Sequence, residues 1–148
     1  METPQSAASE IAIATLRERA PLAFDLAAQF KAAGFRLALV GGPVRDSLLG
    51  RLGNDLDFTT DARPDDTKKI MKKWAEDIWD VGIKFGTIGA KKSDITFEVT
   101  TYRADSYESD SRKPEVDFGD TIEGDLLRRD FTVNAMAIEL TTPTPEFI

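Results

Sequence analysis

The segment GNDLDFTTD, residues 53–61, places two acidic side chains inside a short apolar stretch. Side chains alternate between the two faces of a strand, so Asp55 and Asp57 share one face. Leu56 and Phe58 share the other face and can enter a core. The segment therefore predicts a strand whose apolar face is buried and whose acidic face is wet.

Other segments of the chain show both helical and strand patterns. Apolar residues recur at helical spacing from Ser9, a predicted N-cap, to about Ala33, with Pro21 starting a second helix and Gly34 ending it. Further helices are predicted at 43–50, 64–77 and 120–137, and strands at 35–42, 55–60, 85–91, 94–103 and 135–140, with 85–91 and 94–103 adjacent. This mixture predicts an α/β fold, an α+β mixed sheet with helices packed on it.

Composition limits the chemistry available to the chain. Among 148 residues there is no cysteine and no histidine, so a metal would need oxygen ligands, which favours Mg²⁺, Mn²⁺ or Ca²⁺. The net charge of −7 argues against a broad nucleic-acid-binding face. The first residues, METPQSAASE, lack the features of a secretory signal, and no apolar run is long enough to span a membrane. We therefore expect a cytoplasmic protein without a membrane partner.

The aspartate pair is the first candidate for a functional site. Like charges at this spacing repel each other, and a divalent cation is the simplest remedy. The alternative is two ordinary acids on an exposed strand, although aspartate is depleted in strands. Glu98 lies in the alternating segment DITFEVTTYR and could face the same cleft if the two strands are neighbours. It could equally be an ordinary half-exposed strand residue.

A glycine turn is the second candidate. In LVGGPVRD, Gly41 and Gly42 separate a predicted strand from a helix start, where backbone amides attract phosphate. Arg45 could reach the same phosphate or pair locally with Asp46. Many strand–helix turns contain glycine, so this motif alone is weak evidence.

An arginine-rich segment is the third candidate. EGDLLRRDFTVNA brings together two arginines, an aspartate and an asparagine: Arg128, Arg129, Asp130 and Asn134. Guanidinium groups bind phosphate and ribose oxygens bidentately, although such residues also form surface networks at helix ends. The three candidates complement one another: the acids could bind a metal ion, the glycine turn a phosphate and the arginines a triphosphate. Together they indicate metal-dependent phosphoryl or nucleotidyl transfer.

Four segments in this order resemble the N-terminal head domain of class II tRNA nucleotidyltransferases (CCA-adding enzymes) and bacterial poly(A) polymerases. The resemblance covers roughly residues 35–140 and rests on GGPVRD, DLDFTTDA, EVTTYRADSY and EGDLLRRDFTVNAMA. The stretch RKPEVDFGDTIEGDLLRRDF looks most like actinobacterial CCA-adding enzymes.

The resemblance implies a polymerase-β-like nucleotidyltransferase fold and a set of residue roles. Asp55 and Asp57 match the catalytic carboxylates that hold two Mg²⁺ ions, with Mn²⁺ as an alternative. The matches to the nucleotide-binding motifs are Gly41, Gly42, Arg45, Arg128, Arg129, Asp130 and Asn134. Supporting matches are Asp46, Glu98 and Arg103.

The resemblance also implies partners and domain limits. Residues 1–34 would form a helical segment packed on a head domain of residues 35–148, and the family's neck, body and tail would be absent. The expected partners are CTP, ATP and the tRNA 3′ end, with CMP and AMP added to complete CCA and with weak activity from this chain alone. The alternatives are a poly(A) polymerase head and, from another class, a non-catalytic nucleotide-binding domain.

Overall fold

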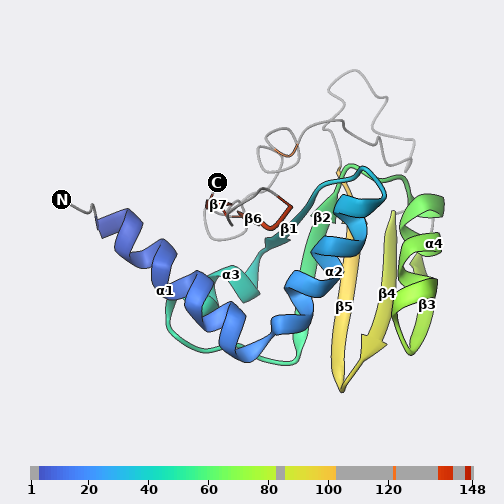
Figure 1. The fold of residues 1–148 in the computed structure, drawn as a ribbon. Coiled ribbons are helices and arrows are strands. Elements are labelled where there is room, and N and C mark those ends of the chain that lie inside the picture. The colour runs from blue at the N-terminus through green and yellow to red at the C-terminus, as the bar shows by residue number, and fades with distance from the viewer. Residues whose placement is uncertain (1–3, 83–85, 103–121, 123–136, 142–145, 148) are drawn as a thin grey trace, which may run out of the picture.

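The computed structural model describes residues 4–82, 86–102, 122, 137–141 and 146–147. This part of the chain contains four helices and one seven-stranded sheet (Figure 1). The helices are α1 (Pro4–Arg19), α2 (Pro21–Ala32), α3 (Gly42–Leu48) and α4 (Pro64–Trp74). The strands are β1 (Leu37–Val40), β2 (Asp55–Thr60), β3 (Asp77–Gly82), β4 (Thr87–Lys92), β5 (Ile95–Thr101), β6 (Ala137–Glu139) and β7 (Glu146–Phe147).

The first two helices separate where the sequence predicted. Pro21 begins α2, and Gly34, at φ 88°, follows its last residues. The amides of Gly34 and Phe35 donate to the carbonyls of Lys31 and Phe30, which is a Schellman ending that favours glycine. The predicted N-cap at Ser9 is wrong, because α1 begins at Pro4 and Ser9 lies inside it.

The sheet is mixed, with strand order β3-β4-β5-β2-β1-β6-β7. β2 and β5 run parallel, and every other adjacent pair among the described strands is antiparallel. The predicted adjacency of β4 and β5 is confirmed. The mixed sheet with packed helices is also confirmed. β2 thus lies in the interior of the sheet, between β1 and β5.

One face of the sheet forms the main core with α1, α2 and α4. Leu56 and Phe58 of β2 join Phe97 of β5 in this core, where the two phenylalanine rings stack at 6.0 Å. Trp74 of α4 meets Phe97 edge to face at 5.1 Å and donates from Nε1 to Asp25 of α2 at 2.9 Å. Because strand side chains alternate, this burial turns the neighbouring polar residues of β2 and β5 to the opposite face.

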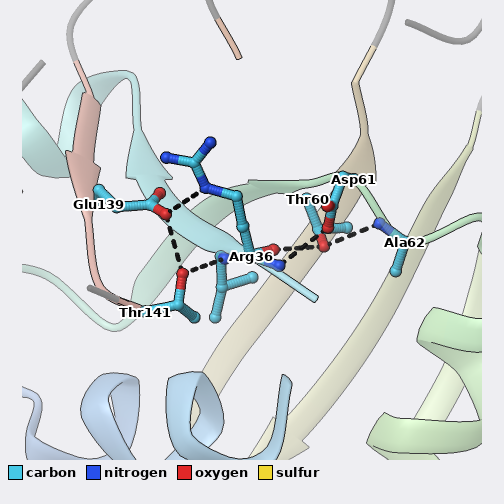
Figure 2. A network of polar contacts seen from close by, with 7 residues as sticks. Arg36, Thr60, Asp61, Ala62, Glu139 and Thr141 are labelled. Atoms are coloured by element: carbon cyan, nitrogen blue, oxygen red, sulfur yellow. Dashed lines mark hydrogen bonds and ion pairs between the residues drawn. The ribbon is translucent and has the colours of Figure 1, made fainter. Parts of the chain in front are cut away.

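A polar network closes the sheet beyond the carboxyl end of β2 (Figure 2). Arg36 donates from Nε to Oε1 of Glu139 at 2.8 Å, and Thr141 donates its hydroxyl to the same oxygen at 2.9 Å. Thr60 donates to the Arg36 carbonyl at 2.6 Å, and the Arg36 amide donates to Asp61 at 2.8 Å. We call these five residues the Arg36 network. It ties β1, β2 and β6 together.

Two strands and several element boundaries differ from the sequence predictions; α3, for example, ends at Leu48 rather than at residue 50. The helix predicted to reach residue 77 ends at Trp74, and the strands β3 and β7 were not predicted. The predicted helix at 120–137 falls largely outside the described residues, whereas part of the predicted last strand appears as β6. Within the described part of the chain, no helix is long and apolar enough to cross a membrane.

Candidate active site

The two aspartates of β2 lie on one face of the sheet. Asp55 and Asp57 are exposed while Leu56 and Phe58 are buried, which confirms the alternation expected from the sequence. In the parallel pairing of β2 with β5, Asp57 lies opposite Glu98. Adjacent strands are about 4.8 Å apart, so three carboxyl groups gather on neighbouring strands. We call Asp55, Asp57 and Glu98 the acidic cluster.

The acidic cluster surrounds a cavity of about 350 Å³. Its lining is formed by the three acids, Leu56 and Thr96. Burial raises the pKa of Glu98 above its ordinary value of 4.5, and the negative charges of Asp57 and Asp55 raise it further. The gathered negative charges therefore favour protonation of Glu98 and attract cations to the cavity.

The acidic cluster has oxygen ligands that suit a hard divalent cation, but only as part of that cation's ligand set. Within the described residues, no group of three acids is arranged so that it could itself hold a metal ion. Mg²⁺ commonly uses one or two carboxylates and takes its remaining ligands from water and substrate phosphates. Asp55 and Asp57 provide two such carboxylates on an exposed face, and their oxygen chemistry suits this hard cation.

The glycine turn lies beside the start of β2. β1 runs antiparallel to β2 with Leu39 opposite Phe58, so the chain leaving β1 at Gly41 comes next to the amino end of β2. Gly41 has φ 75° and ψ −143°, a conformation essentially restricted to glycine. Gly41 is buried and Gly42 is half-buried. Among the described residues, apart from its chain neighbours, no atom lies within 4 Å of a Cβ atom built on Gly41.

Arg45 pairs with its neighbour Asp46, which is one of the two contacts that the sequence analysis considered for it. Its guanidinium group lies 3.3 Å from Oδ1 of Asp46, and both side chains are on the surface. Exposed ion pairs contribute little stability, so this contact would not hold Arg45 away from a phosphate.

The structure describes seven of the predicted site residues and leaves the others untested. Gly41 and the α3 residues Gly42, Arg45 and Asp46 lie on the β1 side of β2, and Asp55, Asp57 and Glu98 lie on β2 and β5. The remaining predicted residues fall outside the described residues: Arg103, Arg128, Arg129, Asp130 and Asn134.

The sequence analysis did not single out Thr96 as a site residue. Thr96 lies opposite Asp55 and lines the cavity. The available signal was its position two residues before Glu98, which puts both side chains on the same face of β5.

Comparisons with known proteins connect this geometry to one family. Residues 37–146 match the family model described as the poly A polymerase head domain. A CCA-adding enzyme from Enterococcus faecalis is 42% identical over 126 residues, which are 84% of this chain and 29% of that protein. The chain thus spans less than a third of this relative.

Solved structures show the same likeness. A Bacillus stearothermophilus CCA-adding enzyme in complex with CTP matches with a TM-score of 0.65 and 38% identity, over 80% of this chain and 27% of that one. A Thermotoga maritima CCA-adding enzyme complexed with tRNA matches with a TM-score of 0.70 and 25% identity, over 91% of this chain and 30% of that one. Together with the family model, these matches show that the chain belongs to the poly A polymerase head domain family.

Proposed function

We propose that this chain is the catalytic head of a template-independent RNA nucleotidyltransferase that adds CMP and AMP from CTP and ATP to the tRNA 3′ end. The observation that carries the proposal is the acidic cluster, placed on an open face directly beside the glycine turn. The relatives named CCA-adding enzymes favour CCA addition. We propose the cytoplasm as its location, as the family resemblance implies.

Each group of candidate site residues would have its own role in this reaction. Asp55 and Asp57 would hold Mg²⁺, with Mn²⁺ as a substitute, and Glu98 would add negative charge beside them. Bound Mg²⁺ would supply activation of the RNA 3′-hydroxyl and stabilisation of the departing pyrophosphate. The backbone at Gly41 and Gly42, with Arg45, would bind the triphosphate. Arg128, Arg129, Asp130 and Asn134 would bind its ribose and phosphates, with Asp46 and Arg103 in support.

The reaction requires these groups to align two substrates. The 3′-hydroxyl oxygen of the RNA gives up its proton to water and forms a bond to the α-phosphorus. The bond from that phosphorus to the oxygen that bridges it to the β-phosphate breaks, and pyrophosphate leaves. We propose that parts of the relatives beyond the length of this chain hold the tRNA and select the base. This chain alone would then transfer weakly.

A poly(A) polymerase head is the second candidate, favoured by the description of the matching family model. Joining the chain to a neck, body and tail and measuring the product separates the two. A product that ends after CCA supports the proposal, whereas an open-ended adenosine tail supports the second candidate.

The first experiment is calorimetric titration of ATP and CTP into the chain, with and without Mg²⁺. We expect Mg²⁺-dependent binding with similar heats for both nucleotides, and loss of that binding in Asp55→Asn plus Asp57→Asn. The matched control is Asp65→Asn plus Asp80→Asn. It removes two charges on the helix-covered side of the sheet, where Asp80 makes a surface pair with Lys68.

Two results would contradict the proposal. One is nucleotide binding that does not change when the two aspartates of β2 are replaced. The other is an equal loss of binding in the control variant, which would mean that total charge rather than the acidic cluster matters.

A further inference from the structure

Trp79 is an exposed aromatic residue on the edge strand β3, with 38% of its surface accessible. The strand registers place it in one row across four neighbouring strands. From β3 to β2, the residues of that row are Trp79, Gly89, Glu98 and Asp57. Trp79 therefore lies on the same face of the sheet as the acidic cluster.

Gly89 allows the indole to lie across the neighbouring strand β4. A Cβ atom added to Gly89 would fall against Nε1 of Trp79 and 2.5 Å from its Cε2. The ring occupies the space that a side chain at position 89 would need. It thus lies about two strand spacings, roughly 10 Å, from the strand that carries Asp57.

The acidic cluster lies between the glycine turn and this ring. Gly41 is on the β1 side of β2, while Trp79 and Gly89 are beyond β5 on the other side. In an in-line displacement the attacking and leaving oxygens lie on opposite sides of the phosphorus. If the glycine turn holds the triphosphate, the RNA acceptor approaches across β5 and β4.

The chemistry of this approach suits an unpaired base and a phosphate. Flat aromatic rings bind single-stranded RNA by stacking, whatever the base. Lys91 follows Gly89 by two residues on β4, shares its face and is exposed, so its ammonium group can reach a backbone phosphate. The net charge of −7 argues against a broad nucleic-acid-binding face, so stacking should contribute a larger part of the RNA affinity.

We propose that Trp79, lying over Gly89, is a stacking platform for an unpaired base of the RNA acceptor strand, upstream of its terminal nucleotide. The proposal rests on the proposed function and on its assignment of the triphosphate to the glycine turn. Trp79 is a positioning residue, because it would contact RNA away from the reacting atoms.

The test is the binding of pentacytidylate, a single-stranded RNA with a free 3′-hydroxyl, measured by fluorescence anisotropy and tryptophan emission with Mg²⁺ present. Trp79→Ala should weaken RNA binding by roughly 5- to 150-fold, whereas Trp79→Phe should retain most of it. RNA should quench the emission of the unaltered chain. In Trp79→Phe the remaining tryptophan is the buried Trp74, so the quenching should disappear.

Gly89→Ala tests the position of the ring without removing it. The added methyl group must displace the indole, so RNA binding should weaken as in Trp79→Ala. Combining the two substitutions should add nothing further. Thermal melts of each variant, followed by circular dichroism, show whether it remains folded.

The outcomes separate this inference from the proposed function. Unchanged RNA affinity in Trp79→Ala, or no quenching by RNA, overturns the platform while Mg²⁺-dependent ATP binding still supports the proposed function. Weakened ATP and CTP binding in Trp79→Ala would assign the ring to the incoming base and also overturn the proposal. Quenching that depends on the protein concentration and not on RNA would mean that Trp79 contacts a second copy of the chain, which also overturns the proposal.

Discussion

The two ends of β2 place carboxylates in opposite surroundings. At its amino end, Asp55, Asp57 and Glu98 gather around an open cavity. At its carboxyl end, Glu139 is fully buried, but the Arg36 guanidinium lies 2.8 Å from it and the Thr141 hydroxyl donates to it. Both groups bind the same oxygen of Glu139, Oε1, while its buried Oε2 has no hydrogen-bond partner among the described residues. The Arg36 network thus sets a positive charge against Glu139, whereas the acidic cluster brings like charges together.

The difference separates a structural carboxylate from carboxylates suited to a ligand. A buried carboxylate is stabilised where an opposite charge and hydrogen bonds replace water, as they do at Oε1 of Glu139. The acidic cluster instead raises the pKa of Glu98 through burial and the charges of Asp57 and Asp55. The cost of that repulsion is removed when a cation binds.

The largest effect is expected from removing the arginine of the Arg36 network. Arg36→Met leaves the Glu139 carboxylate buried without its guanidinium partner, which should lower the free energy of unfolding by about 3 kcal/mol. Urea denaturation measures the change. Arg45→Met is the matched control, because its pair with Asp46 is exposed and should contribute below about 1 kcal/mol. If both variants lost the same free energy of unfolding, the Arg36–Glu139 pair would be no more important for stability than an exposed ion pair.

A smaller effect of opposite sign is expected at the acidic cluster. Asp55→Ala plus Asp57→Ala should keep the fold and raise the free energy of unfolding of the metal-free protein by about 0.5 kcal/mol, because repulsion on one face is relieved. Thermal melting with a chelator measures this gain, and adding Mg²⁺ should reduce or reverse it. A large drop in melting temperature without metal would mean that the acids support the fold.

The smallest effect is a pH dependence that comes from Glu98. Its pKa is raised in the folded state, so the folded protein holds this proton more tightly than the unfolded chain does. Stability is therefore lost as pH rises from 4.5 through the raised pKa. Glu98→Gln should remove that loss. The free energy of unfolding of this variant, relative to that of the unaltered chain, should therefore not change with pH below 4.5 and should increase above it.

Denaturation curves across this pH range test the sign of the Glu98 effect. Glu10→Gln, at an exposed position on α1, is the control and should show no such growth. An advantage of Glu98→Gln that grows as pH falls would contradict the assignment.

Local patterns in the sequence predicted the parts of the fold that depend on local interactions. Pro21 and Gly34 mark the limits of α2 because each restricts or requires a particular backbone conformation. The alternation in β2 and β5 placed Asp55, Asp57 and Glu98 on exposed faces because burial separates the two sides of a strand. These patterns therefore predicted the faces of the three acids, but not that their strands are neighbours.

Interactions between distant segments explain what the sequence did not predict. β3 contains two aspartates and forms its ladder with β4, so no strand pattern marks it. The sequence placed Glu98 beside the aspartates only if β2 and β5 are neighbours. Local sequence patterns do not determine which strands pair, so this pairing could not be predicted. The contact of Arg36 with Glu139 and the row from Trp79 to Asp57 depend on the same long-range registers.

The parallel pairing of β2 with β5 also bears on how the site forms during folding. Asp57 and Glu98 meet only after α4, β3 and β4, which lie between them in the chain, have closed a large loop. Contacts of such sequence separation form slowly, since the chain must lose loop entropy before they form. The acidic cluster should therefore be completed late in folding, after α2 and its capped end can already exist. A chain that is still folding would then have little affinity for magnesium and nucleotide.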